Sequence, residues 1–365
     1  MSRLLMTTDA VGGVWDFSLQ LAESLADYGL EIALAIMGPL PSEKQINEVQ
    51  RIPKITVFES AYRLEWMEDP WEDVTRAGEW LLKLEQELQP DIVHLNGYVH
   101  GSLNWKAPVC LVGHSCVLSW WNAVHHEPAP PSWSNYQSAV QKGIQHCDVL
   151  VAPSLSMLKM LERWYGRAPA SSVIYNGRSA SRFRPGVKQP VIFSAGRLWD
   201  AAKNIDALVR CAGDLPWQFV VAGEGGSERA LPANVCFLGK VSSDRIAQQV
   251  AQASIYCSPA HYEAFGLSVL EAALAGCALV LSDINSFQEL WDGAALFVPP
   301  DDDGRLKQAL GALINDDRLR ADLATAARKR AQKYRLETMV TGYLRLYERL
   351  RRPRRHQENL EILSR

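Results

Sequence analysis

The chain alternates strand-like apolar runs with helical patterns from its first residues to its last. Runs such as Glu31–Met37 and Ala278–Ser282 are short and almost unbroken, which is typical of strands buried on both faces of a parallel sheet. The longer stretches between them repeat apolar residues every three or four positions and predict helices on both faces. At 365 residues, the chain is long enough for two such domains with full cores.

The apolar runs form two successive series of strands. In the first series, strands are expected at Arg3–Thr8, Glu31–Met37, Ile55–Glu59, Ile92–Asn96, Val109–Gly113, Val149–Ala152 and Val173–Tyr175. In the second series, they are expected at Val191–Ala195, Gln218–Ala222, Val235–Leu238, Ile255–Cys257, Ala278–Ser282 and Ala295–Val298. Helices are expected at Trp15–Tyr28, Thr75–Leu88, Trp133–Gln145, Ser154–Tyr165, Asn204–Ala212, Ser243–Ala253, Gly266–Gly276 and Ser286–Asp292, and repeatedly from Gly304 to Arg352.

A polar segment separates the two series. Phe183–Pro190 carries two prolines and a glycine among polar residues, and it is predicted to be an interdomain linker. The domain boundary is therefore expected between residues 184 and 185. Because ligands of open parallel sheets bind at the C-terminal ends of the strands, two such domains indicate a ligand cleft between them.

The composition narrows the class of protein. A hydrophobic content of 47% with 22% charged residues is ordinary for a soluble globular protein. No long apolar run opens the chain, so neither a signal peptide nor a membrane span is expected. Seven cysteines are scattered without a Cys-x-x-Cys pair, which indicates reduced core thiols in a cytoplasmic protein and no zinc site.

The charge pattern bears on partners. The formal net charge is −3, which gives no case for nucleic acid as the main partner. One basic cluster closes the chain, formed by Arg349, Arg351, Arg352, Arg354 and Arg355. A solvated tail is the first interpretation of this cluster, and a weak contact with an anionic lipid or polymer is the second.

Two carboxylates, Glu263 and Glu271, stand eight positions apart around a predicted helix start at Gly266. Glu263 would lie on the loop just before that start, and Glu271 about a turn and a half inside. The amides of Gly266, Leu267 and Ser268 would face outward, where a helix N-terminus attracts phosphate. Together these groups fit a sugar nucleotide. The alternative interpretation is a capped helix with two solvated glutamates.

Three further places in the sequence carry candidate binding groups. Gly12-Gly13 follows the first strand, and its backbone can approach a diphosphate or form a plain tight turn. Arg197 and Lys203 flank the turn after Val191–Ala195, either as fixed cations for a diphosphate or as ordinary surface charges. His114 follows Val109–Gly113, as a group that hydrogen-bonds the ligand or as a satisfied polar residue.

Aromatic residues are concentrated among the prolines between residues 120 and 136. Flat apolar faces with a polar handle suit sugar rings, and exposed loop aromatics are often binding residues. This region is therefore assigned to the acceptor side, with packing of the domain as the alternative for some of its members. The aromatic residues are Trp120, Trp121, Trp133 and Tyr136.

In this order and spacing, the motifs resemble retaining glycosyltransferases with two Rossmann-like domains (the GT-B fold), specifically glycosyltransferase family 4. The resemblance spans nearly the whole chain. The stretches that carry it are Gly12-Gly13, "DIVHLNG" (Asp91 to Gly97), His114, "VIYNGR" (Val173 to Arg178), "SAGRLWDAAKN" (Ser194 to Asn204), "VVAGEG" (Val220 to Gly225), "SPAHYEAFGLSVLEAALAGCALVLSD" (Ser258 to Asp283) and "FVPPDD" (Phe297 to Asp302).

The resemblance implies an architecture and a set of roles. Two Rossmann-like domains would face one another across a cleft, an acceptor-side domain at residues 1–184 and a nucleotide-sugar domain at 185–335. A return helix at 336–352 would cross back to the first domain, with a polar tail at 353–365.

The implied roles lie mostly in the second domain. Glu263 and His114 would be catalytic, and Glu271 would hold the ribose hydroxyls. The donor would also contact Gly12, Gly13, Arg197, Lys203, Phe265, Gly266, Leu267 and Ser268.

The sequence therefore predicts a retaining, metal-independent hexosyltransferase. The donor would be a nucleoside diphosphate sugar, and the acceptor a hydroxyl of a saccharide or lipid-linked saccharide, with no other cofactor. A phosphorylase or epimerase of the same fold is the alternative among enzymes. A catalytically silent sugar-nucleotide-binding subunit is the alternative from another class.

Overall fold

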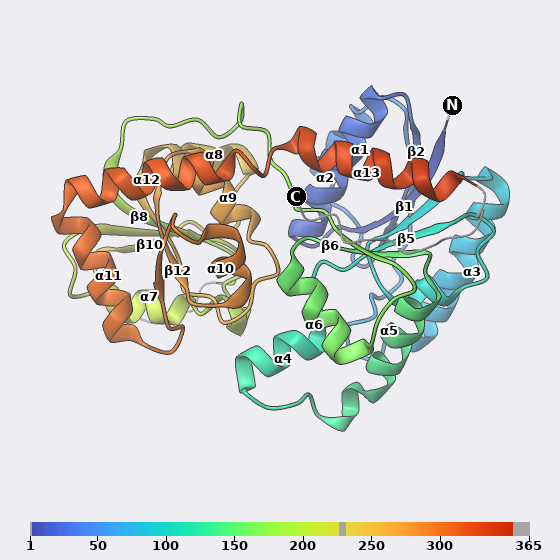
Figure 1. Cartoon of the computed structure of the whole chain (residues 1–365), viewed down its shortest axis with the longest axis horizontal. Coiled ribbons are helices and arrows are strands. Elements are labelled where there is room, and N and C mark those ends of the chain that lie inside the picture. Colours follow the sequence, from blue (N-terminus) through green and yellow to red (C-terminus); the bar gives the residue numbers. More distant parts are fainter. Residues whose placement is uncertain (1, 226–230, 353–365) are drawn as a thin grey trace. The chain divides into compact units, whose positions relative to one another are not determined.

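The chain folds into two compact units (Figure 1), in a computed structural model that describes residues 2–225 and 231–352. Of these residues, the first unit holds 2–119, 128–175 and 339–352. The second unit holds 120–127, 176–225 and 231–338. The main chain therefore passes between the units at Ser119–Trp120, Glu127–Pro128, Tyr175–Asn176 and Thr338–Met339.

The first unit is built on a seven-stranded, wholly parallel sheet with the strand order β3-β2-β1-β4-β5-β6-β7. Its strands are β1 Arg3–Asp9, β2 Glu31–Met37, β3 Ile55–Glu59, β4 Ile92–Leu95, β5 Val109–Val112, β6 Val149–Ala152 and β7 Ser171–Val173. The α-helices of this part of the chain are α1 Gly13–Asp27, α2 Glu43–Gln50, α3 Trp71–Leu88, α4 Val117–His125, α5 Ser134–His146 and α6 Leu155–Tyr165. Two 3₁₀ turns lie at η1 Val99–Ser102 and η2 Pro131–Trp133.

The second unit is built on a six-stranded parallel sheet with the order β10-β9-β8-β11-β12-β13. Its strands are β8 Gln189–Ala195, β9 Gln218–Ala222, β10 Val235–Phe237, β11 Ala253–Ser258, β12 Ala278–Ser282 and β13 Leu296–Val298. Its helices are η3 Ala201–Lys203, α7 Ile205–Ala212, α8 Ser243–Gln252, α9 Leu267–Leu274, α10 Asn285–Trp291, α11 Asp303–Asn315 and α12 Asp317–Ala331. A last helix, α13 Leu336–Arg351, begins here and continues into the first unit.

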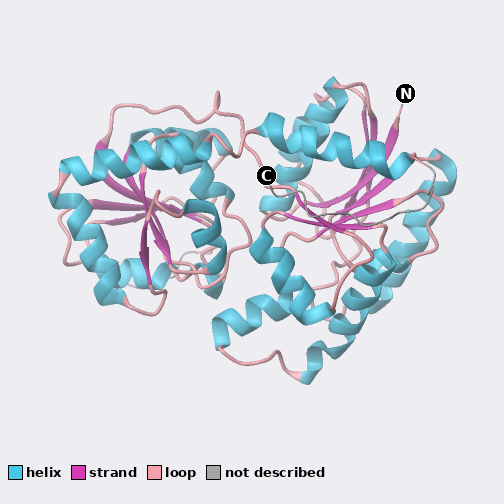
Figure 2. Ribbon diagram, in the orientation of Figure 1, coloured by secondary structure: helices cyan, strands magenta, loops and turns pink. Residues whose placement is uncertain are grey.

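Helices cover both faces of each sheet (Figure 2). Alternate residues of the second sheet enter separate cores. Ile192 and Ile255 pack into one core, and their neighbours Phe193 and Tyr256 pack into the other. This period of two is what a strand buried on both faces requires. The predicted class, two Rossmann-like α/β domains with parallel sheets, is confirmed.

Each sheet has one place where the strand order reverses, between β1 and β4 in the first unit and between β8 and β11 in the second. At such a switch point the connections leave toward opposite faces and open a crevice beyond the C-terminal ends of the strands, where ligands of this fold class bind. The residues after β1, β4, β8 and β11 are therefore the places to search for a site.

Phe183–Pro190 is not a linker in the structure. Phe183 is buried in the core of the second unit. The Lys188 ammonium donates to the carbonyl oxygens of Val250, Ala253 and Ala275 at 2.8–3.1 Å. The prolines and glycine indicated irregular backbone correctly, but these tertiary contacts, invisible in a local pattern, fix the segment to the second unit.

Helices α2 and α4 lie where the sequence analysis expected none. In α2 only Val49 is buried, so its apolar repeat is too weak to be recognised. Helix α4 contains Trp120 and Trp121, which were assigned to a loop because prolines follow them.

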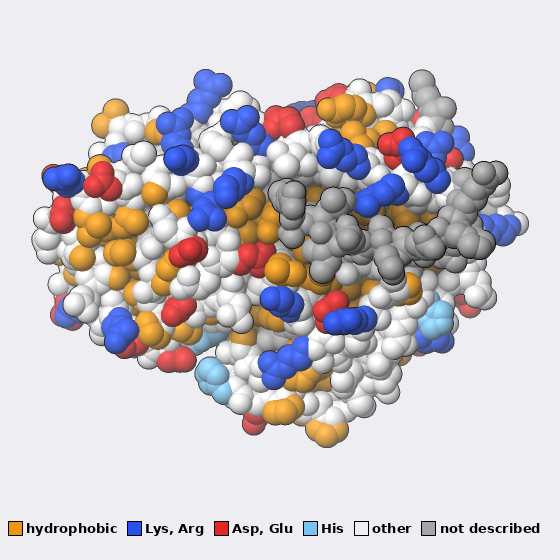
Figure 3. Space-filling model, in the orientation of Figure 1, with side chains coloured by type: hydrophobic (Ala, Val, Ile, Leu, Met, Phe, Trp, Pro, Cys, Tyr) orange, Lys and Arg blue, Asp and Glu red, His pale blue; other side chains and the backbone are white. Residues whose placement is uncertain are grey.

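The described residues on one face of the molecule carry side chains of both charges (Figure 3). On the face drawn in Figure 3, Lys and Arg side chains are interspersed with acidic and uncharged ones. Within residues 2–225 and 231–352, no helix is both long and apolar enough to span a membrane. Of the C-terminal basic cluster, Arg351 lies 3.8 Å from Asp91 and Arg352 lies 3.0 Å from Glu348. Arg354 and Arg355 lie outside the described residues.

Helix α13 packs two tyrosines onto the first sheet. The Tyr347 hydroxyl lies 2.6 Å from His94 Nδ1, and the Tyr343 ring lies 5.4 Å from the His94 ring. Both tyrosines are buried, but the Tyr343 hydroxyl has no hydrogen-bond partner among the described residues. Tyr343 and Tyr347 lie on the same helix, but only the Tyr347 hydroxyl makes a hydrogen bond to a described residue.

This difference generates a stability prediction. Tyr347→Phe leaves the buried His94 Nδ1 without its donor and should lower the free energy of unfolding by about 1–3 kcal/mol. Tyr343→Phe removes a hydroxyl that is already unpaired, so it should be neutral or stabilising. Urea unfolding of both variants measures the contrast, and equal losses would contradict it.

Candidate functional site

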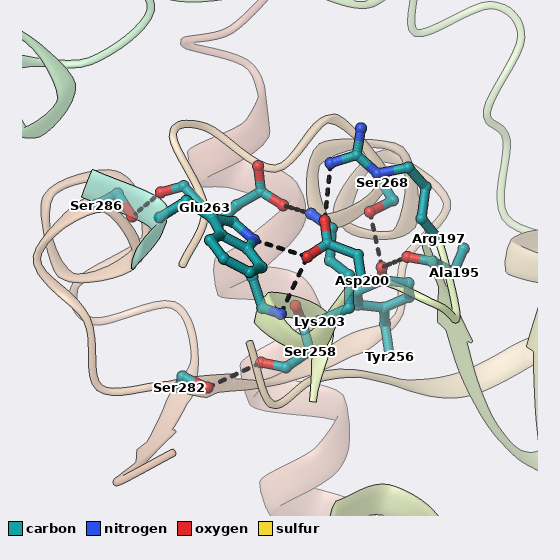
Figure 4. A network of polar contacts seen from close by, with 12 residues as sticks. Ala195, Arg197, Asp200, Lys203, Tyr256, Ser258, Glu263, Ser268, Ser282 and Ser286 are labelled. Atoms are coloured by element: carbon teal, nitrogen blue, oxygen red, sulfur yellow. Dashed lines mark hydrogen bonds and ion pairs between the residues drawn. The ribbon is translucent and has the colours of Figure 1, made fainter. Parts of the chain in front are cut away.

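A network of charged and polar side chains lies at the switch point of the second sheet (Figure 4). Arg197 and Lys203 lie on the connection that follows β8, and Glu263 lies on the loop that follows β11. Since β8 and β11 are neighbours in the sheet, both connections leave from the same edge. The topology therefore brings together residues that are 60 positions apart in the sequence.

Lys203 and Glu263 hold one another. The Lys203 ammonium donates to Glu263 Oε2 at 2.6 Å, and the two side chains are 20% and 19% exposed. The Ser286 hydroxyl, at the start of α10, donates to the backbone carbonyl of Glu263. The loop that carries Glu263 is thus fixed from both sides, and its charge is matched within the site.

Arg197 is held by a partner that the sequence analysis did not identify. Arg197 Nη2 donates to Asp200 Oδ2 at 2.8 Å, and Trp120 Nε1 donates to Asp200 Oδ1 at 2.8 Å. Burial acts to raise the pKa of Asp200, but the Trp120 hydrogen bond and the Arg197 charge outweigh it and lower the pKa. The Arg197 guanidinium also lies over the Trp199 ring, 5.2 Å from its centroid, so two contacts orient it.

Helix α9 begins at Leu267, one residue after the predicted start. Gly266 has φ +84°, and a Cβ on it would lie 3.0 Å from Phe287 Cε1 and 3.1 Å from Val269 Cγ2. The position therefore requires glycine for its dihedral and for space. The Ser268 hydroxyl accepts a hydrogen bond from Tyr256 at 2.8 Å. The Phe265 side chain is buried, with its ring 5.6 Å from that of Tyr334, so only its backbone is placed to meet a ligand.

Glu271 is largely enclosed by protein. Its side chain is 13% exposed, and Arg178 Nε donates to its Oε1 at 2.8 Å. Arg178 is itself buried. Removing one member of such a pair leaves the other charge uncompensated, so Glu271→Gln is expected to affect stability as well as binding.

His114 belongs to a separate network at the switch point of the first sheet. Asn96 Nδ2 donates to the carbonyl oxygen of Thr7. Its Oδ1 therefore accepts from His114 Nε2 at 2.7 Å and from His94 Nε2 at 3.2 Å. Burial lowers the pKa of His94 to about 4, and burial together with His94 lowers the pKa of His114 to about 3. Both imidazoles are therefore neutral at pH 7, with the proton on Nε2.

Gly12 and Gly13 lie at the start of α1, after β1, the strand that carries Thr7 of this network. Gly12 precedes the helix with φ +74°, and a Cβ on Gly13 would meet no atom within 4 Å. The turn is fixed by Asp9, whose Oδ1 accepts from the Val11 amide at 2.7 Å. This geometry is compatible with both earlier interpretations, a tight turn and a backbone approach to a ligand.

The four candidate acceptor-side aromatic residues belong to different units of the structure. Trp120 and Trp121 lie on α4 among the residues of the second unit. Trp133 and Tyr136 lie in the first unit, with ring centroids 5.6 Å apart. Tyr136 is 2% exposed, and its hydroxyl accepts from the Val117 amide. Tyr136 therefore packs the domain.

Sequence reasoning missed the residues that hold the others: Arg178, Asp200, Asn96 and Ser286. For Arg178, Asp200 and Asn96 a signal existed, since all three lie inside the motif stretches that carry the family resemblance. Ser286 stands at a position where the resembled family commonly has glycine, and that departure was the available signal. Within the part of the chain that the structure describes, no cluster of three or more His, Cys, Asp or Glu side chains fits a metal ion.

Two protein-family models match this chain. Residues 11–182 match the model of Glycosyltransferase Family 4, and residues 178–330 match that of Glycosyl transferases group 1. The two matches overlap at residues 178–182, and together they contain every candidate site residue. The chain belongs to glycosyltransferase family 4.

Two curated relatives of this family member are named as a mannosyltransferase and a glycosyltransferase. It is 27% identical over 369 residues to the phosphatidyl-myo-inositol mannosyltransferase of Mycolicibacterium smegmatis, with 93% of this chain and 91% of that protein covered. It is 23% identical to the D-inositol 3-phosphate glycosyltransferase of Rhodococcus erythropolis, with 94% and 87% covered.

Solved structures share the GT-B fold. Sucrose-phosphate synthase from Thermosynechococcus elongatus matches with a TM-score of 0.82 at 18% identity, covering 96% of this chain and 99% of that one. Anabaena HepE in complex with UDP-glucose matches with a TM-score of 0.78 at 19% identity, covering 96% and 100%.

The start of α9 gives a second prediction. Gly266→Ala should lower the free energy of unfolding by about 1–3 kcal/mol, because alanine is strained at φ +84° and its methyl group meets Phe287. Gly13→Ala is the matched control: it also stands at a helix start but has open space, so it should be neutral or slightly stabilising. Thermal or urea unfolding without ligand measures both. A Gly266→Ala variant as stable as Gly13→Ala would contradict this account of the loop.

The buried histidines give a third prediction. Between pH 6.5 and about 4, the unfolded chain binds a proton at His94 that the folded chain does not. The contribution of His94 to stability is therefore fully present above pH 6.5 and is lost as the pH falls to about 4, by up to about 3 kcal/mol. His94→Gln should remove this loss, so in urea unfolding the variant should be more stable at pH 4, relative to its own stability at pH 6.5, than the wild type is. A variant with the slope of the wild type would show that His94 titrates normally.

Proposed function

We propose that this glycosyltransferase is retaining and metal-independent. It transfers a hexose from a nucleoside diphosphate sugar to a hydroxyl of a saccharide or lipid-linked saccharide. The single observation that carries the proposal is the Lys203–Glu263 pair beside the N-terminus of α9. It sets a cation, a carboxylate and helix amides at one switch point.

These three groups match the three parts of the donor. The Lys203 ammonium has three donors, so it holds Glu263 and a phosphate oxygen at once. The amides at the start of α9 add hydrogen bonds to the diphosphate. The Glu263 carboxylate favours the positive charge that develops at the anomeric carbon. Glu271, further along the same helix, accepts from the ribose hydroxyls.

The reaction then needs no strong base in the protein. The acceptor oxygen bonds to the anomeric carbon while the bond from that carbon to the phosphate oxygen breaks. The departing phosphate oxygen takes the acceptor's proton, and Lys203, Arg197 and the α9 amides stabilise its charge. His114, neutral at pH 7 with its proton on Nε2, serves as a hydrogen-bonding group for the donor rather than as a cation.

The comparisons support the choice of substrates. HepE was solved with UDP and with UDP-glucose, which supports a nucleoside diphosphate sugar as the donor. The mannosyltransferase relatives are named for an inositol lipid and the glycosyltransferase relatives for an inositol phosphate, which supports a polyol or lipid-linked hydroxyl as the acceptor. Free thiols, buried at six of seven cysteines, support a cytoplasmic location.

The direct test is incubation with UDP-, GDP- and ADP-hexoses, with and without EDTA, followed by NMR of the sugar product. Transfer or slow hydrolysis that survives EDTA, with the anomeric configuration of the donor kept, is expected. Loss of activity in EDTA that magnesium or manganese restores would overturn metal independence. Turnover that requires inorganic phosphate would indicate a phosphorylase, an isomerised donor an epimerase, and binding without turnover a silent subunit.

Kinetics of charge variants give a fourth prediction. Lys203→Ala should lower kcat/KM by about 10²-fold, because a cation beside a developing anion is worth about 3 kcal/mol. Lys240→Ala is the control, since the Lys240 side chain is 79% exposed and pairs, among the described residues, with the exposed Glu224. Glu263→Gln should chiefly lower kcat, because its charge matters most in the transition state. Near-normal kinetics for Lys203→Ala would place the diphosphate elsewhere.

A further inference from the structure

Arg178 lies at a junction of three segments of the second unit. Its amide donates to the Tyr334 carbonyl and its carbonyl accepts from the Leu336 amide, both at 3.2 Å, so it forms a parallel bridge with Arg335. The preceding Gly177 permits this close approach, because a Cβ there would lie 2.5 Å from the Arg335 carbonyl oxygen. The backbone of Arg178 is thus fixed by hydrogen bonds to the residues immediately before and at the start of α13.

The side chain of Arg178 leads from this junction to Glu271. The two side chains are 7% and 13% exposed, and Arg178 Nε lies 2.8 Å from Glu271 Oε1. A guanidinium is planar and directional, so a bond through Nε holds the Oε1 oxygen in place and hinders rotation of the carboxylate. Since a carboxylate accepts about four hydrogen bonds, this bond is compatible with further acceptance from a ligand.

We propose that Arg178 is a positioning residue for donor binding: it orients the Glu271 carboxylate to accept from the ribose hydroxyls. The inference rests on the proposed function, in which Glu271 holds the ribose. Three observations carry it: the fixed backbone of Arg178, the burial of both side chains and the directed bond from Arg178 Nε to Glu271 Oε1. A purely structural ion pair would stabilise the fold without affecting how strongly the protein prefers a nucleotide with ribose hydroxyls over one without them.

The test measures recognition of the ribose hydroxyls. The probes are the nucleoside diphosphate, among those of uridine, guanosine and adenosine, that the wild type binds most tightly, and its 2′,3′-dideoxy form. Calorimetric titration gives the dissociation constant of each. A hydrogen bond to a carboxylate is worth 10-fold or more in affinity, so the wild type should prefer the ribose form by about that factor.

Arg178→Met keeps the apolar stem and removes the guanidinium. It should reduce the ribose preference to about 3-fold or less, while the affinity for the dideoxy form stays within about 3-fold of the wild type. Arg178→Lys keeps the charge without the planar Nε–H, so it remains informative if Arg178→Met fails to fold, and its ribose preference should lie between those of Arg178→Met and the wild type. The double variant Arg178→Met with Glu271→Gln leaves no unpaired buried charge, and it is the reference for complete loss of the Glu271 contact, with no preference expected.

The outcomes separate this inference from the proposed function. A wild type that binds none of the three diphosphates contradicts both. A wild type that binds with no ribose preference contradicts the inference and the ribose role of Glu271, but leaves the proposed transfer reaction standing. If Arg178→Met or Arg178→Lys keeps the full ribose preference and lowers only the melting temperature, the pair is structural and the inference is overturned.

Discussion

Charges at the C-terminal edge of the second sheet are held in pairs, and the geometry of the site depends on this pairing. A charge removed from water is tolerated only with a partner and further hydrogen bonds. In two of the three pairs the partners come from distant segments of the chain, so these pairs also fix one segment against another, while Arg197 and Asp200 lie on the same connection. The pairs are Glu271–Arg178, Glu263–Lys203 and Asp200–Arg197.

The paired arrangement has a chemical consequence. A sugar nucleotide presents a diphosphate, which needs cations, and hydroxyl groups, which need acceptors. A site with matched cations and carboxylates offers both without accumulating charge before the ligand arrives. The second network, in which burial keeps His94 and His114 neutral and both rings hydrogen-bond Asn96, follows the same rule with uncharged groups. In both units, the polar groups gather where the strand order reverses.

The sequence was sufficient for the fold and for the outline of the site. Unbroken apolar runs fix the strands of a parallel sheet because both faces are buried, and most predicted strands agree with the structure within two residues. The glycine before α9 was also readable, since a loop that enters a helix at positive φ requires glycine. The family resemblance supplied the expected roles, which the geometry of Lys203 and Glu263 accommodates.

The remaining features depend on contacts between distant residues, which no local pattern carries. Arg178 and Glu271 are 93 positions apart, and Trp120 and Asp200 are 80 apart. The predicted linker failed for the same reason, because Phe183 enters a core that the chain completes only later. Local composition shows that a residue is charged or that a segment is irregular, but not what will lie against it.

A structure of the protein with a bound nucleoside diphosphate would test the central claim most directly. The account predicts the diphosphate against Lys203 and the amides at the start of α9, with the ribose hydroxyls about 3 Å from the Glu271 carboxylate oxygens. A nucleotide whose ribose lies beside Gly12-Gly13 in the first unit, away from Glu271, would contradict it.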